Sequence, residues 1–207
     1  AARTMSAAIL IGTSGYSFAD WVGPFYPPGT RSADFLAFYA RHFSTVEVNA
    51  TYYRIPEASV LARMESKTPP GFRFVVKLHQ SMTHDRTLEP ATVASFLGAL
   101  KPLRDAGKYD GLLAQFPWSF RRTPENRRHL AALRVVLAGE PLWVEFRHDS
   151  WLAPEVPVAQ GARHRLVRGG RAAAPRSAAA GDDAHHRRRL RALSRPQRRD
   201  LVGKGCG

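Results

Sequence analysis

The sequence predicts an α/β fold with a parallel sheet. Five short apolar segments alternate with four segments of helical periodicity between residues 8 and 156. No phosphate-loop or dinucleotide glycine fingerprint is present, which weakens the interpretation as a nucleotide-binding open sheet. An open doubly wound sheet and part of an eight-stranded barrel both fit the pattern. A complete barrel needs about 250 residues, so the pattern accounts for about five of eight strand-helix units.

The five predicted strands are short runs rich in apolar residues. We expect the first, residues 8–12, to be buried and to lead into a turn over residues 12–16. The remaining four strands cover residues 44–49, 72–79, 111–117 and 142–148. Side chains alternate between the two faces of a strand. Three polar pairs should therefore share faces at strand ends, namely Glu47 with Asn49, Lys77 with His79, and Glu145 with Arg147.

Four helices are predicted between these strands. The first begins near Ser32, and the second contains Leu61 and Met64 and ends before residues 69–71. Apolar residues from 93 to 103 mark the third helix. The fourth has the clearest boundaries, with Thr123 as N-cap, Pro124 at the first helical position and Gly139 beyond the end.

Residues 157–207 differ in composition from the rest of the chain. They contain no aromatic residue, and basic residues exceed acidic ones by 10, against 4 for residues 1–156. Such a segment is typical of disorder, and its arginine clusters are typical of an arm that binds nucleic acid. A third interpretation is GC-rich DNA translated out of frame, because a shift of one nucleotide permits aromatic and strand-like runs there. We predict a partial barrel domain over 1–156 and a basic, low-complexity tail over 157–207 that is out of frame and disordered.

Several classes of protein are disfavoured. No apolar run reaches the roughly 18 residues that span a bilayer, so we expect a cytoplasmic protein with no membrane partner. Cys206 is the only cysteine, which excludes an internal disulfide and a cysteine-based zinc site within this sequence. No nucleophile elbow supports acyl transfer.

The motifs of this chain resemble those of a known family, the bacterial and archaeal domain-of-unknown-function 72, or YecE-like, proteins. The similarity covers about residues 8–156. It rests on Gly12-Thr13-Ser14-Gly15-Tyr16, Trp21, Phe25-Tyr26-Pro27, Val46-Glu47-Val48-Asn49 with Thr51-Tyr52-Tyr53, Phe74-Val75-Val76-Lys77, Gln115-Phe116-Pro117 and Glu145-Phe146-Arg147-His148 with Ser150-Trp151. The resemblance implies a (β/α)8 barrel of the triose-phosphate-isomerase (TIM) type, present here as roughly its first five β/α units.

Polar residues at strand ends suggest a site, because barrel enzymes act at the C-terminal ends of their strands. The candidate catalytic residues are Glu47, Lys77, Glu145 and Arg147. The glutamates could transfer protons while the cations bind a phosphate-bearing ligand such as nucleic acid. Three alternatives stay open: a carbohydrate hydrolase with its glutamates about 5 to 9.5 Å apart, a non-enzymatic binding protein, and interior salt bridges that only fix the barrel. As written, the chain should be an inactive, poorly soluble fragment with two unpaired sheet edges.

The candidate ligand-binding residues lie in loops and at strand ends. They are Thr13, Ser14, Tyr16, Asn49, Tyr52, Tyr53, Gln115 and His148. Backbone amides at residues 13 and 14 could hold an anion, or could form a plain turn. The aromatic residues could stack on a base or sugar, or could cap the barrel mouth. A divalent metal held by His79, His84, Asp85 and His148 is weakly supported, because no close-spaced ligand motif is present.

Overall fold

The computed structural model describes residues 9–152 and 164–168. The chain divides into one compact unit of residues 1–170 and a second unit of residues 171–207, which lies outside the described residues. The prediction of a disordered, out-of-frame tail therefore falls outside the described residues, except for the short segment at 164–168.

Within the described residues, six parallel strands form one sheet, and they follow one another in chain order. They are β1 (Gly12–Ser14), β2 (Thr45–Val48), β3 (Arg73–Lys77), β4 (Tyr109–Gln115), β5 (Leu142–Phe146) and β6 (His164–Arg168). A doubly wound sheet reverses its strand order at a switch point, whereas a barrel keeps chain order. The order thus confirms the α/β prediction and matches part of a barrel.

Two features of the sheet differ from the sequence-based expectation. The first strand occupies Gly12–Ser14, while Ile9 and Ile11 before it are 85% and 66% exposed. The prediction of a buried strand over residues 8–12 was therefore wrong, because among the described residues β1 pairs only with β2. The second difference is β6, which pairs in parallel with β5 along its whole length. This strand has no aromatic residue and little alternation, so the sequence pattern did not reveal it.

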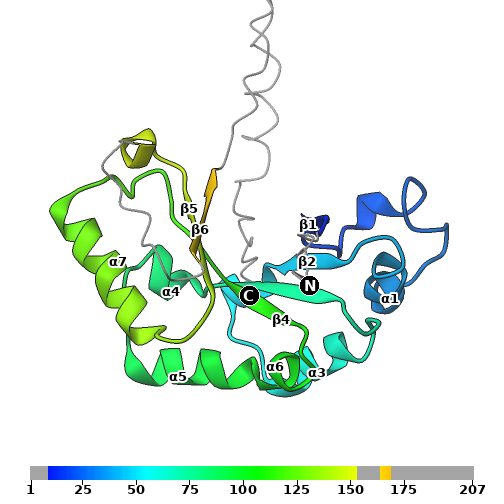
Figure 1. Cartoon of the computed structure of the whole chain (residues 1–207). Coiled ribbons are helices and arrows are strands. Elements are labelled where there is room, and N and C mark those ends of the chain that lie inside the picture. Colours follow the sequence, from blue (N-terminus) through cyan, green and yellow to red (C-terminus); the bar gives the residue numbers. More distant parts are fainter. Residues whose placement is uncertain (1–8, 153–163, 169–207) are drawn as a thin grey trace, which may run out of the picture. The chain divides into compact units, whose positions relative to one another are not determined.

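The helices lie along the outer side of the curved sheet, where Figure 1 shows α1, α3, α6, α5 and α7 in succession. The helical elements are η1 (Ala19–Trp21), η2 (Ser32–Asp34), α1 (Phe35–Tyr39), α2 (Ala50–Tyr53), α3 (Ala58–Glu65), α4 (Gln80–Thr83), α5 (Pro90–Ala99), α6 (Lys101–Asp105), α7 (Pro124–Val136) and η3 (Asp149–Leu152). The third predicted helix is divided into α5 and α6, because Pro102 has no N–H to continue the helix. The predicted cap of α7 is confirmed, since Thr123 Oγ1 accepts a hydrogen bond from Asn126 N at 3.2 Å.

The two faces of the sheet have different characters. One face supplies buried side chains to the core, including Val46, Phe74, Val76, Leu112 and Ala114. The opposite phase of the same strands carries the polar residues near the strand ends. A bulge at Asp110 adjusts β4 against β3, and Gly111 beside it has a φ of +144°. A Cβ there would lie 2.8 Å from Pro141 O, so a larger residue would displace the neighbouring strand.

Candidate functional site

A row of hydrogen-bonded polar side chains crosses the C-terminal ends of β3, β4 and β5. Lys77 Nζ donates to Gln115 Oε1 at 2.7 Å, and Gln115 Nε2 donates to Glu145 Oε1 at 2.9 Å. Arg147 Nε lies 3.3 Å from the same Glu145 oxygen. Parallel pairing brings these residues together, because Gln115 and Glu145 are register partners at the ends of their strands. We call Lys77, Gln115, Glu145 and Arg147 the polar row.

Lys77 is the cation at the inner end of this row. Its ammonium lies 5.1 Å from the centre of the Tyr52 ring, within cation–π distance. Burial lowers the pKa of Lys77, while the charges of Glu47 and Glu145 raise it. Within the described ranges Lys77 forms no ion pair shorter than 4.0 Å. The cation is therefore held by an amide and a ring rather than neutralised by a contacting carboxylate.

Glu145 and Arg147 form an ion pair at the outer end of the row. The Glu145 side chain is 16% exposed and the Arg147 side chain is 56% exposed. Ion pairs of this exposure contribute little to stability, about 0 to 1 kcal/mol. One of the salt bridges expected under the structural alternative is thus present, and Arg147 still presents much of its guanidinium to solvent.

Glu47 belongs to a second hydrogen-bonded group at the ends of β1 and β2. Ser14 Oγ donates to Glu47 Oε1 at 2.9 Å and accepts from Asn49 Nδ2 at 2.8 Å. Asn49 Oδ1 is buried and has no hydrogen-bond partner among the described residues. Ser14 and Glu47 are register partners, which accounts for their contact. Glu47 and Glu145 lie on β2 and β5, with β3 and β4 between them.

Tyr52, in the short helix α2 that follows β2, contacts Lys77, and His84, at the end of the short helix α4 that follows β3, contacts Tyr52. The rings of Tyr52 and His84 are 5.0 Å apart and nearly perpendicular. Burial lowers the pKa of His84, and the cations of Lys77 and Arg147 lower it further, against an opposing effect of Asp85. The sequence predicted a role for His84 only as a possible metal ligand. Its position shortly after the strand β3 is the signal that places it near Lys77.

Three predicted ligand residues lie apart from the polar row. Thr13 points toward the core, where its N–H and its hydroxyl both donate to Tyr39 Oη. Tyr16 is half-buried and packs on Tyr39, and its burial raises its pKa. Tyr53 is 73% exposed and contacts Tyr52 edge-on. Thr13 and Tyr16 thus contact the core side of the first turn, and their roles as ligand residues stay predictions.

His79 and His148 each stabilise a turn after a strand. His79 caps α4, since its Nδ1 accepts from Ser81 N at 3.3 Å. His148 Nδ1 accepts from Ser150 N at 3.0 Å, and its ring lies 4.7 Å from that of Trp118. Sequence reasoning missed Trp118, although it directly follows the Gln115-Phe116-Pro117 motif at the end of β4.

The described part of the chain contains no group of three or more His, Cys, Asp or Glu side chains placed to hold a metal ion. None of the helices within the described ranges combines the length and apolar character needed to cross a membrane.

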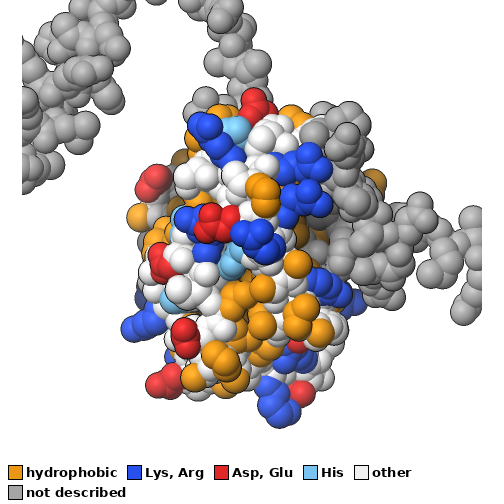
Figure 2. Space-filling model, turned by 90° about the vertical axis from the view of Figure 1, so that its left-hand side faces the viewer, with side chains coloured by type: hydrophobic (Ala, Val, Ile, Leu, Met, Phe, Trp, Pro, Cys, Tyr) orange, Lys and Arg blue, Asp and Glu red, His pale blue; other side chains and the backbone are white. Residues whose placement is uncertain are grey.

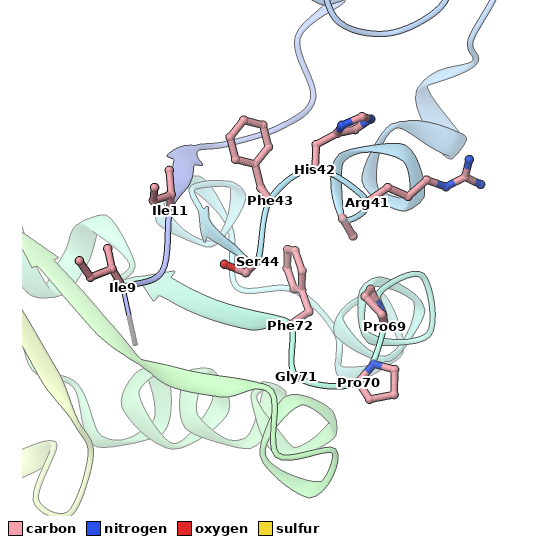
Figure 3. A pocket seen from close by; sticks show the side chains of 11 residues that line it. Ile9, Ile11, Arg41, His42, Phe43, Ser44, Pro69, Pro70, Gly71 and Phe72 are labelled. Atoms are coloured by element: carbon pink, nitrogen blue, oxygen red, sulfur yellow. The ribbon is translucent and has the colours of Figure 1, made fainter. Parts of the chain in front are cut away.

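A separate pocket lies at the opposite, N-terminal ends of β2 and β3 (Figure 3). Its lining includes Ile9, Ile11, Phe43 and Phe72, and barrel enzymes rarely place chemistry at that end.

The comparisons with known proteins agree with this geometry. The family model described as "Protein of unknown function DUF72" matches residues 10–173. This chain belongs to the DUF72 family. The match reaches beyond residue 156, where the sequence motifs of the family were expected to end, and it includes β6.

Two curated relatives are uncharacterised proteins of the UPF0759 group. The chain is 34% identical to UPF0759 protein YunF of Bacillus subtilis over 152 residues, which is 70% of this chain and 53% of that protein. It is 33% identical to UPF0759 protein YecE of Escherichia coli K12 over 121 residues, covering 56% and 42% respectively. The chain therefore spans about half the length of the curated relatives it matches.

Solved DUF72 structures have the same architecture. The crystal structure of a family member from Thermotoga maritima superposes with a TM-score of 0.63 at 37% identity, over 70% of this chain and 58% of that one. A member from Enterococcus faecalis gives a TM-score of 0.61 at 29% identity, over 71% and 54%. The family and the partial barrel predicted from the sequence are thus confirmed.

Proposed function

We propose that the C-terminal edge of this sheet binds a phosphate-bearing ligand through Lys77 and Arg147. The observation that carries the proposal is the environment of Lys77. Its ammonium contacts a neutral amide at 2.7 Å and an aromatic ring at 5.1 Å, and no carboxylate contacts it among the described residues. A partly buried cation without a contacting counterion attracts an anion, because charge-assisted hydrogen bonds to phosphate oxygens are strong.

The site contains two carboxylates as well as two cations, and Glu47 and Glu145 balance Lys77 and Arg147 in formal charge. Whether the site attracts a phosphate therefore depends on where these side chains point, because its net charge is zero. Glu47 is bonded to Ser14, and Glu145 accepts from both Gln115 and Arg147. These contacts direct the carboxylates toward neighbouring side chains, which leaves the Lys77 ammonium and the exposed part of Arg147 available to a phosphate.

Hydrolysis of the bound phosphate ester is the second part of this proposal. Water would attack phosphorus while the ester P–O bond breaks, one glutamate would accept the proton of the water, and the other would protonate the leaving oxygen. Glu145 is suited to the first role because Gln115 and Arg147 fix its orientation. Glu47, on the far side of Lys77, takes the second role.

The binding step is tested with the Lys77→Met variant. We expect at least a tenfold loss of affinity for inorganic phosphate and for phenyl phosphate, since a charge-assisted hydrogen bond contributes about 1.5–3 kcal/mol. Isothermal titration calorimetry measures this, with Lys77→Arg as the charge-preserving control. Equal phosphate affinity in the Lys77→Met variant and the unmodified protein would refute the proposed site.

The catalytic roles are tested separately with the Glu145→Gln variant of a protein whose reading frame and later β/α units have been restored. This variant should bind phosphate esters as the restored protein does, and should lose turnover of any ester that the restored protein hydrolyses. Unchanged turnover in this variant would eliminate Glu145 as the base while leaving the binding site in place.

The relatives are about twice as long as the matched region, so we infer that turnover requires β/α units beyond those described. We also propose that the part of the basic tail beyond the family match, residues 174–207, arises from a shift of reading frame in a cytoplasmic member of the family, as its composition suggests. Sequencing the DNA from the codon for Trp151 onward tests this. A single missing or extra base upholds the inference, and an intact reading frame contradicts it.

A further inference from the structure

Beyond the polar row, the segment that joins β4 to α7 carries an exposed aromatic ring among arginines. Trp118 is 58% exposed. Four arginines follow it within ten residues, and Glu125 is the only acidic residue among them. They are Arg121, Arg122, Arg127 and Arg128, and none of them forms an ion pair within the part of the chain that the structure describes. We call Trp118 and these four arginines the Trp118 platform.

The backbone of this platform is held in place by the segment that follows β5. Trp151 Nε1 donates to Phe120 O at 2.7 Å, and the two rings stack with centres 5.5 Å apart. Ser150 Oγ accepts from Arg122 N at 2.9 Å. On the other side, the buried Asn126 donates to Arg121 O at 2.7 Å. A surface fixed in this way loses little conformational entropy when a ligand binds.

The platform adjoins the proposed phosphate site. Trp118 lies three residues after Gln115, and its ring is 4.7 Å from that of His148, the neighbour of Arg147 in the chain. Figure 2 looks onto the side of the molecule that carries α7; Lys and Arg side chains lie in the upper and central parts of this face, with an acidic side chain among them at the centre, and others lie lower down. A chain of phosphates could therefore pass from the α7 arginines to the polar row.

We propose that the Trp118 platform binds single-stranded nucleic acid and delivers one of its phosphates to the polar row. A base stacks on the exposed Trp118 ring, and the arginines contact flanking phosphates. This combination of an aromatic stacking surface with a cationic track is how proteins bind single strands without sequence preference. The proposal rests on the proposed function, and it names the substrate class of that site.

Single-stranded nucleic acid fits this surface better than two other anionic partners. A base within a duplex is already stacked on its neighbours, so Trp118 could reach it only after the base left the helix. A membrane surface is better matched by several apolar side chains around the cations, and between residues 118 and 128 Trp118 is the only large hydrophobic residue that is exposed.

The test uses the full chain and a fluorescein-labelled ten-nucleotide dT strand, followed by fluorescence anisotropy. Trp118→Ala changes no charge, so the basic residues of 157–207 contribute equally to binding by both proteins. We expect at least fivefold weaker binding, the lower limit for removal of one stacked base. Trp118→Phe should restore most of the affinity, while the quenching of tryptophan fluorescence by the unlabelled strand should be largely lost.

The contribution of the arginines is tested by salt dependence. The double variant R127Q/R128Q should lower the slope of log affinity against log salt by about 1.4, because each phosphate contact on a single strand contributes about 0.7. The matched control is R41Q/R63Q, which removes the same charge from exposed positions outside the platform. Equal slopes for the two double variants would contradict the proposal.

Other outcomes separate this inference from the phosphate site. Unchanged dT affinity and unchanged quenching in Trp118→Ala would overturn the platform, as would Trp118-dependent binding to anionic phosphatidylglycerol vesicles without binding to dT. If the Lys77→Met variant loses affinity for phosphate while the Trp118→Ala variant keeps full affinity for dT, the phosphate site is supported and the Trp118 platform is refuted. If Trp118→Ala loses dT affinity while Lys77→Met keeps phosphate affinity, the platform stands as a binding surface and its link to Lys77 fails.

Discussion

Lys77 shows how a single side chain can be poised for a ligand by neighbours that do not neutralise it. Thr51 Oγ1 donates to Lys77 O at 2.7 Å, which fixes the strand end, and Gln115 fixes the ammonium. A lysine held in this way keeps its position although no carboxylate contacts its ammonium within the described residues. The same burial that orders the side chain also destabilises its charged form.

The lowered pKa of Lys77 predicts how phosphate affinity depends on pH. As pH rises, Lys77 should lose its proton below the ordinary lysine value of 10.5, so affinity should begin to fall earlier than for an exposed lysine. Lys77→Arg keeps its charge over this range, so its affinity should not show this fall. Calorimetric titrations between about pH 7 and pH 10.5 measure both profiles, using the lysine and arginine reference values. Parallel profiles would show that Lys77 does not carry the interaction.

At the scale of single elements, α7 is the best-defined helix and the support of the Trp118 platform. Thr123 caps its first turn, Asn126 is buried beneath it, and Leu133 and Leu137 join the core. The aromatic stack of Phe146 and Trp151, with centres 4.1 Å apart, packs beside its N-terminal loop. The helix therefore links the core to the surface on which the further inference depends.

Removal of the α7 cap predicts a measurable loss of stability. Thr123→Ala should lower the free energy of unfolding by about 1 kcal/mol, because Asn126 N loses its acceptor, while Thr123→Ser should retain most of it. Urea unfolding followed by circular dichroism measures the difference. A Thr123→Ser variant as unstable as Thr123→Ala would show that the hydroxyl does not act as the cap.

At the scale of the whole molecule, the sheet has β1 and β6 at its edges within the described residues. Unpaired parallel edges expose N–H and C=O groups that can pair with another chain. Near the β1 edge, Ile9 and Ile11 are strongly exposed. The arrangement indicates a surface suited to burial against further strands, in agreement with relatives about twice as long as the region they share with this chain.

This edge predicts self-association of the chain. Sedimentation velocity over a concentration series should show growing oligomers, and Ile9→Lys/Ile11→Lys should shift the distribution toward monomer by adding charge at the edge. Val135→Lys is the control, because Val135 is 74% exposed but lies on α7. A purely monomeric protein, or an equal effect of Val135→Lys, would contradict the prediction.

The sequence by itself determined the parallel α/β architecture, the family and the caps of α7. These features are local, since hydrophobic periodicity, Thr123 with Pro124, and short motifs at strand ends are all written in consecutive residues. Alternation along each strand also placed Glu47, Lys77, Glu145 and Arg147 on faces that the structure confirms as partly exposed and polar. Their chemical roles stay predictions.

Only the tertiary structure decided how these residues are grouped. Strand register set the Lys77–Gln115–Glu145 chain and placed Glu47 with Ser14 instead. Register depends on pairing between strands far apart in sequence, including the bulge at Asp110, so no local pattern encodes it. For the same reason β6 was missed and the first strand was misplaced, since both depend on which neighbours a segment finds in the folded sheet.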